Sequence, residues 1–401
     1  MTDLPTETGL IEDQANIVSL GPVGRFTFPN LPGSDLYPGL ASAGAMTRAA
    51  SREALAWLDE ETFDDERRAM LGLDIVGGQM SPLALALLAS GSQILLDDGT
   101  EPAGSAARVD VGADDRTSAM PTAHEALRVL QDNGGVIVRA AHQSTAGLRD
   151  LHFDLVNAHR ARVELMLVAG SAALSKIVRP GVESIVCIVA GEGSVRSQGF
   201  APLPVTPGDV VAVPGPVRIN GYANTLSLVI IIDRPQQFDR RTFLVRRAVC
   251  HPRLRLDLPA NVDDLQNVYG SPEPMTYVQV MEEEIEALLV SSSEDDFDAW
   301  WSARLVSPTT ATTNMSNLSR VRGRFPGGAT IVSTHPDHAL VAAGGWLLAV
   351  GHQAMATFTR FVAREVLDGG DPLERELFFV LSGLGLAEVV NVAERGADRA
   401  A

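Results

Sequence analysis

The sequence predicts an α+β protein in which a small β-barrel or sandwich is flanked by helices, and two observations lead to this fold class. Between Arg162 and Asp233, short runs rich in Val, Ile and Leu alternate with turn signals such as Pro180-Gly181 and Pro207-Gly208-Asp209. Several short strands at this spacing are typical of antiparallel sheets that pack face to face. Outside this region apolar residues recur at helical spacing, as they do from Thr145 to His159.

The composition limits the class of protein. With 401 residues, 45% of them hydrophobic and 20% charged, the chain can bury a large core and divides into two or three parts. Its net charge of −18 argues against nucleic acid as a partner, because phosphate binding needs clustered Lys and Arg. The N-terminus has no secretion signal and no segment has the ~20 apolar residues that cross a bilayer, so we expect no membrane partner. Cys187 and Cys250 form no disulfide framework, which favours the cytoplasm.

Changes in the spacing of apolar residues, and the positions of Gly and Pro, predict how the chain is organised. The first residues carry scattered Pro and Gly without periodicity, so they are expected to form an extended lead-in with little structure. Helical patterns precede and follow the strand-rich region, and the end of the chain mixes strands with helices. The predicted segments are the lead-in at 1–45, a helical extension at 46–119, the barrel at 120–235, a helical region at 236–305 and a C-terminal domain at 306–401.

The order of the turn signals is similar to that of a known barrel family. The turn Gly191-Glu192-Gly193 follows a buried strand, and the segment Pro207 to Pro214 precedes an apolar strand, as the two conserved cupin segments do. The strand at 134–138, the helix at 148–159 and the segment 253–259 resemble elements of the bacterial JmjC cupins related to ribosomal-protein hydroxylases. This resemblance covers about residues 80–390. It implies a double-stranded β-helix (cupin/JmjC-like) barrel, a helical dimerisation region and a C-terminal winged-helix-like domain.

The resemblance breaks at the iron site. Iron(II) in these oxygenases is held by two His and one carboxylate, with open positions for 2-oxoglutarate and oxygen. The resemblance places Val178, Arg179 and Pro180 where the His-x-Asp segment belongs, and Ile219 where the distal His belongs, with Asn220 beside it. No histidine lies anywhere between residues 160 and 250. We therefore expect no metal and no cofactor, with Fe(II) and 2-oxoglutarate as the alternative.

Two His-containing motifs offer other metal ligands. His152-Phe153-Asp154 is a literal His-x-Asp, but it lies in a predicted helix, where residues i and i+2 point about 200° apart around the axis. His152 and Asp154 are thus ordinary helix residues, and the alternative metal site would need a third ligand such as His251. The segment 335–338, His-Pro-Asp-His, lies between two apolar strands and is expected to be a solvated turn.

Four polar residues are candidates for a pocket at the mouth of the barrel. If the resemblance holds, Lys176, Arg179, Arg218 and Asn220 cluster there and suit an anionic group. The alternative is that they are exposed residues at strand ends. Cys187 lies in an apolar strand and is expected to be a core residue, not a nucleophile.

Two classes of function remain. The first is a catalytically degenerate JmjC/cupin-like protein that binds a protein, a peptide or an active paralogue without iron. The alternative is an enzyme, either an Fe(II)/2-oxoglutarate-dependent hydroxylase with unusual ligands or another cupin enzyme. Phe297, Trp300, Trp301 and Leu305 are close enough in sequence to form one apolar surface. We therefore expect a homodimer, or a heterodimer with a related protein.

Overall fold

The chain forms two compact units in this computed structural model: residues 48–234 form one, and residues 1–47 with 235–401 form the other. We call them the two-sheet unit and the terminal unit. Among the helices that the structure describes, none is both long and apolar enough to cross a membrane. The described residues are 17–21, 37–58, 62–73, 93–97, 123–174, 182–197, 200–215, 217–250, 279, 282, 285–286, 294–302, 304–305, 320–334, 336–368 and 370–390.

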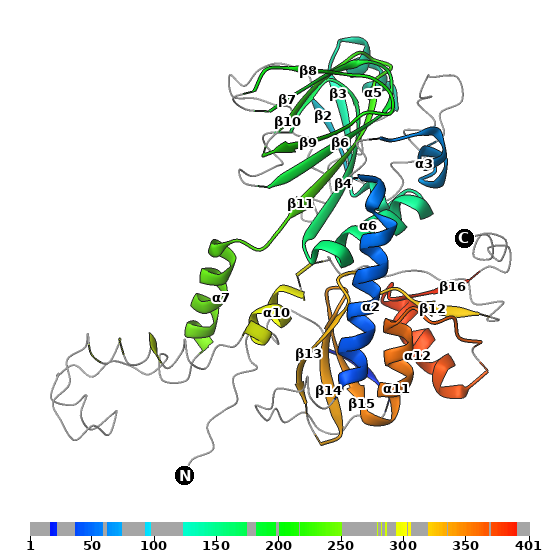
Figure 1. Cartoon of the computed structure of the whole chain (residues 1–401), viewed down its shortest axis with the longest axis vertical. Helices are drawn as coiled ribbons and strands as arrows, with labels where there is room; N and C mark the ends of the chain where they lie inside the picture. The colour runs from blue at the N-terminus through cyan, green and yellow to red at the C-terminus, as the bar shows by residue number, and fades with distance from the viewer. Residues whose placement is uncertain are drawn as a thin grey trace. The chain divides into compact units, whose positions relative to one another are not determined.

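The two-sheet unit contains two antiparallel sheets (Figure 1). The larger sheet has the order β2 (Gln93–Asp97), β3 (Gly135–Arg139), β4 (Arg162–Gly170), β11 (Leu226–Asp233), β6 (Glu183–Ala190) and β9 (Val210–Pro214). The smaller sheet has the order β5 (Ala172–Ala173), β10 (Val217–Gly221), β7 (Gly193–Ser197) and β8 (Leu203–Val205). Side chains from both sheets join one buried aliphatic cluster, so the sheets pack face to face, as the strand-rich sequence predicted.

This cluster forms because successive side chains along each strand point alternately between the sheets and outward. β11 lies between β4 and β6, and Val229 is opposite Met166 on one side and Val186 on the other. All three side chains point between the sheets, and the next residue on each strand points outward. Gly191 forms the predicted turn after β6 with φ +73°, and a Cβ there would lie only 2.7 Å from Thr225 Cα, so glycine is required.

Helices cover the larger sheet. α5 (Ala123–Gln131) contacts β2 and β3, and α6 (Ala146–His159) contacts β4. The predicted helix at the position of α6 is confirmed, because the Thr145 hydroxyl caps it by accepting a hydrogen bond from the Leu148 amide at 3.1 Å. Its apolar residues are buried, and it ends at Arg160 in a left-handed conformation.

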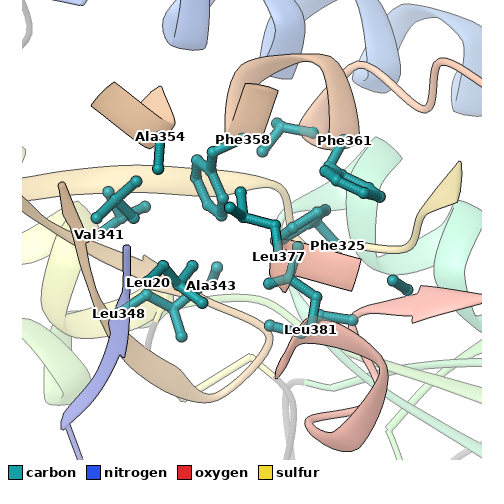
Figure 2. Close-up of a cluster of buried hydrophobic side chains, with 14 of the residues drawn as sticks. Leu20, Phe325, Val341, Ala343, Leu348, Ala354, Phe358, Phe361, Leu377 and Leu381 are labelled. Carbon is teal, nitrogen blue, oxygen red and sulfur yellow. The ribbon is translucent and has the colours of Figure 1, made fainter. Parts of the chain in front are cut away.

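The terminal unit is built on a four-stranded sheet with helices packed against it. The order is β1 (Ile17–Leu20), β15 (Trp346–Gly351), β14 (His338–Ala343) and β13 (Ala329–Thr334), and β1 is parallel to its neighbour. The other described elements are α11 (His352–Val362), α12 (Pro372–Gly383), the start of α2 (Pro38–Ala54), and the pair β12 (Val321–Gly323) and β16 (Ala387–Val389). Figure 2 shows their core, in which Phe358 and Phe325 meet edge to face with centroids 5.3 Å apart. The predicted mixture of strands and helices is confirmed for this part of the chain.

Two expectations for the terminal unit need correction. The lead-in is not uniformly without structure, because residues 17–20 form β1 and pair with β15, a partner more than three hundred residues later. A run of four residues, three of them apolar, could not reveal a partner so distant. His338 is not solvated: it begins β14 and is 1% exposed, while Pro336 and Asp337 form the exposed turn. His335 lies outside the described residues.

The aromatic residues expected to form a docking surface are buried inside the terminal unit. α7 (Gln237–Cys250) and α10 (Glu294–Ser302) contact each other, and α10 also contacts β13 and β14. Trp300 is 3% exposed and Trp301 2%, and Arg304 stacks on the Trp300 ring at 4.0 Å. These aromatic side chains therefore do not form the exposed apolar surface on which the expected dimer was based. Dimerisation itself is not tested by them and stays a prediction.

Candidate functional site

The space between the two sheets is lined almost entirely by aliphatic side chains. Ile219, at the position that the resemblance gives to the distal His, is 1% exposed and belongs to this cluster. The other buried members are Ile137, Met166, Val168, Ala172, Leu174, Val182, Val186, Ile188, Val195, Val205, Val217, Val229 and Ile231. Ser227 follows the same alternation on β11, and its buried hydroxyl has no hydrogen-bond partner among the residues that the structure describes. The described part of this interior contains no imidazole, and its only carboxylates are those of Glu164 and Asp233 at one end.

Charged side chains appear at one end of the interior. Arg139 follows the core residue Ile137 by two positions on β3, and Glu164 precedes Met166 by two on β4, so both share the interior-facing side of the sheet. The two groups form a bidentate ion pair, with Arg139 Nε donating to Glu164 Oε1 at 2.5 Å and Nη2 to Oε2 at 3.0 Å. Their side chains are 33% and 28% exposed, so solvent reaches the pair.

Two further charged residues lie at the same end. Arg162 is two residues before Glu164 on β4, and Asp233 is two residues after Ile231 on β11. The strand register places Arg162 directly opposite Asp233, and both residues are half-buried. We call Arg139, Arg162, Glu164 and Asp233 the charged end. It offers two guanidinium and two carboxylate groups next to an apolar interior.

Two of the four pocket candidates predicted from the sequence, Arg218 and Asn220, lie elsewhere. Arg218 and Asn220 alternate on β10 with the core residues Val217 and Ile219, so they occupy the outward face of the smaller sheet. Asn220 Nδ2 donates to Ser194 Oγ at 3.3 Å. The structure therefore keeps these two residues on one strand face but directs them away from the interior. Lys176 and Arg179 lie outside the described residues.

The literal His-x-Asp is part of helix α6, as the apolar spacing predicted. His152 Nε2 lies 3.1 Å from the backbone oxygen of Val163, and its ring stacks on His142 with centroids 4.1 Å apart. Asp154 instead accepts a hydrogen bond from Ser51 Oγ at 3.2 Å. The two side chains thus contact different neighbours. His251, the third ligand of that alternative, lies outside the described residues, and the described part of the chain contains no group of three His, Cys, Asp or Glu suited to a metal ion.

The predicted core role of Cys187 is confirmed. The residue is fully buried on β6, and burial raises the pKa of its thiol to about 12. A thiol held in this state is a poor nucleophile at neutral pH, because the thiolate is the reactive form.

Comparisons with known proteins give fold-level likenesses only. No family model matches the chain, and no curated protein matches it. A structure of YcfD, a ribosomal oxygenase from Escherichia coli, is 14% identical over 79% of this chain and 92% of that chain, with a TM-score of 0.43. Two structures of YcfD in complex with cobalt and 2-oxoglutarate, and with cobalt and succinic acid, have the same identity and coverage, with TM-scores of 0.44 and 0.43. These similarities confirm the predicted resemblance to ribosomal-oxygenase-like proteins. They do not test the predicted loss of the iron site.

The prediction that no cofactor is involved is wrong by these comparisons, because two of the similar structures hold cobalt with 2-oxoglutarate or succinic acid. The expectation rested mainly on the missing histidines of residues 160–250, and spacing alone could not show which more distant residues fold close to the barrel. The described residues of the interior nevertheless do not fit these groups, since aliphatic side chains fill the position of Ile219 and its neighbours. Donors for a metal would have to come from outside that interior.

Proposed function

We propose that the chain binds a protein or peptide segment at the charged end of its two-sheet unit. The observation that carries this proposal is the Arg139–Glu164 ion pair, which is partly open to solvent at the edge of a filled apolar interior. Because aliphatic side chains fill the described interior between the sheets, little space is left there to enclose a small molecule. A segment presented by a larger partner can instead reach the charged groups from the end of the sheets.

The mixture of charges suits selective recognition of such a segment. Charged groups of both signs favour one register of a bound chain and disfavour others, because like charges brought together repel. Arg139 offers a planar fork of donors and Glu164 offers two acceptor oxygens, so a partner can exchange hydrogen bonds with either group. We further propose, as the resemblance implies, that the two-sheet unit is a double-stranded β-helix barrel and that the terminal unit contains a winged-helix-like domain.

The second candidate is a metal- and 2-oxoglutarate-dependent oxygenase that acts on a protein. The similar structures from Escherichia coli bear the name ribosomal oxygenase and include the complex with cobalt and 2-oxoglutarate. On this chain such an activity needs ligands from outside the described interior. Both candidates share a protein partner, and they differ in whether the bound segment is modified.

The proposal is tested by selecting peptides that bind the immobilised full-length chain and then measuring their affinity for variants. Replacing Arg139 or Glu164 with Gln should weaken binding about tenfold, equivalent to ~1.4 kcal/mol, because one half of a partly buried charge pair is lost. Glu365→Gln is the matched control, since Glu365 forms an ion pair with Arg360 at 2.9 Å within the terminal unit. Equal affinity of all three variants and the unmodified chain would refute the proposal.

The same peptides discriminate the second candidate. The chain is loaded with Fe(II) without oxygen, and succinate release from 2-oxoglutarate is then measured with and without peptide. Peptide-dependent succinate release with a mass increase of one oxygen atom on the peptide would establish the oxygenase. Binding without either signal would leave recognition as the function of the charged end.

We also propose that the chain self-associates, as the resemblance implies. Light scattering should then give a mass well above the 42.6 kDa of one chain. A mass of one chain at micromolar concentration would contradict this proposal.

A further inference from the structure

Strand β1 completes the sheet of the terminal unit from the far end of the sequence. It pairs in parallel with β15, and the register joins Val18 to Leu348 and Leu20 to Val350. Leu20 is 1% exposed and belongs to the core cluster, where Figure 2 shows it beside Leu348 and Ala343. β1 is thus attached by four residue pairs and by one fully buried side chain among the residues described there.

The sheet does not need β1 for its connectivity. β13, β14 and β15 follow one another in sequence and form a continuous antiparallel meander. Most of the core comes from this meander and from α11 and α12. A short element with few buried contacts opens more readily than the core on which it rests.

The edge of β15 has none of the features that usually protect an exposed edge. Natural edge strands carry charges, prolines or bulges that prevent pairing with another chain. The residues Leu347-Leu348-Ala349-Val350 contain no charge and no proline, and the register along them is regular. This edge therefore requires a covering strand, and β1 is the strand that covers it.

We propose that the β15 edge is a strand-accepting site and that β1 of a second copy of this chain occupies it by exchange. The identical strand fits best, since it presents Val18 and Leu20 at the same register as the strand it replaces. Residues 21–36 link β1 to the described segment that begins at Tyr37, and at ~3.3 Å per residue this link has a contour of about 50 Å, enough to reach a neighbouring copy. The strand-accepting site belongs to the terminal unit and the charged end to the two-sheet unit, so the two proposals can fail independently.

The experiment uses cysteines at a registered pair. Ser19 is opposite Ala349, so Ser19→Cys is placed in one preparation and Ala349→Cys in another, each in a full-length chain that carries Cys250→Ser. The two preparations are mixed at tens of micromolar, oxidised and separated on a non-reducing gel. We expect a mixed disulfide between two chains, because exchange brings the two thiols together only across copies.

Two controls set the baseline. Arg149→Cys, an exposed position on α6, replaces Ala349→Cys to report random collisions, and the registered pair should exceed it about tenfold, because pairing raises the effective concentration of the thiols. Adding Leu20→Asp to Ser19→Cys should reduce the mixed disulfide to the level of that control, while circular dichroism confirms that the chain is folded.

The alternative occupant is β1 of the same chain, and the double variant Ser19→Cys/Ala349→Cys reports it. If the double variant closes a disulfide within one chain while the mixed preparations give no more product than the Arg149→Cys control, β1 stays in its own chain and the proposal is wrong. Undiminished cross-linking with Leu20→Asp would also overturn it. Peptide binding at the charged end should be unchanged in all of these variants.

Discussion

Replacing Ile219 with His distinguishes a packed interior from a metal site. Ile219 is 1% exposed within an aliphatic cluster, so the substitution removes a fully buried aliphatic side chain, worth about 2–3 kcal/mol. It also buries an imidazole among groups that cannot hydrogen-bond to it, which costs about 1–3 kcal/mol more. We therefore expect Ile219→His to destabilise the two-sheet unit by roughly 3–6 kcal/mol.

Hydrogen exchange resolved along β10 and β11 is the appropriate assay, because a chain of two units need not unfold in a single step. The control is Ile219→Val, which keeps the branched shape and should cost only about 0.5–1.5 kcal/mol. Exchange protection of Ile219→His within ~0.5 kcal/mol of the unmodified chain would mean that the position is roomy and polar. The reasoning about the interior would then be refuted.

Three further predictions concern single groups. Burial alone would raise the pKa of Glu388, but the charges of Arg324 and Arg322 outweigh burial and hold this pKa below the usual range. The ionised Glu388 carboxylate therefore stabilises the folded chain at any pH above the ordinary glutamate pKa. This stability is lost as the pH falls through the lowered pKa. Glu388→Gln should flatten that acid decline in thermal unfolding, and an unchanged pH profile would contradict the assignment. Because burial raises the pKa of Cys187 to about 12, iodoacetamide at pH 8 should modify it only after unfolding; rapid modification of the folded chain would contradict its core position. Thr145→Ala should lower the stability of α6 by about 1 kcal/mol in hydrogen exchange, whereas Thr145→Ser should not, and equal protection would show that the cap contributes nothing.

Local features of the structure were predictable because their causes lie close together in sequence. The Thr145 cap and the apolar face of α6 need only neighbouring residues, and the same spacing correctly placed His152 and Asp154 on a helix. The turn at Gly191 follows from a glycine that ends a buried strand. These signals also marked the strand-rich region between Arg162 and Asp233, but they missed β2, which lies in the predicted helical extension at 46–119.

The features that the sequence did not predict depend on distant pairing. Arg139 and Glu164 meet because β3 and β4 are neighbours, and the only local signal was that each lies two residues from a core position of its strand. The pairing of β1 with β15 has no local signal at all. Trp300 was predicted to lie on a surface for the same reason, since spacing could not identify Phe243 on α7, which contacts its ring, or β13, which packs against α10.

An exchange of charges at the charged end tests the central claim most directly. The double variant Arg139→Glu/Glu164→Arg keeps an ion pair between the same two strands, so its thermal unfolding should stay close to that of the unmodified chain. The donors and acceptors offered to a partner are interchanged, so titration calorimetry with a selected peptide should show about a tenfold or greater loss of affinity. Unchanged affinity in a folded double variant would contradict the claim that a partner segment binds at this end of the two-sheet unit.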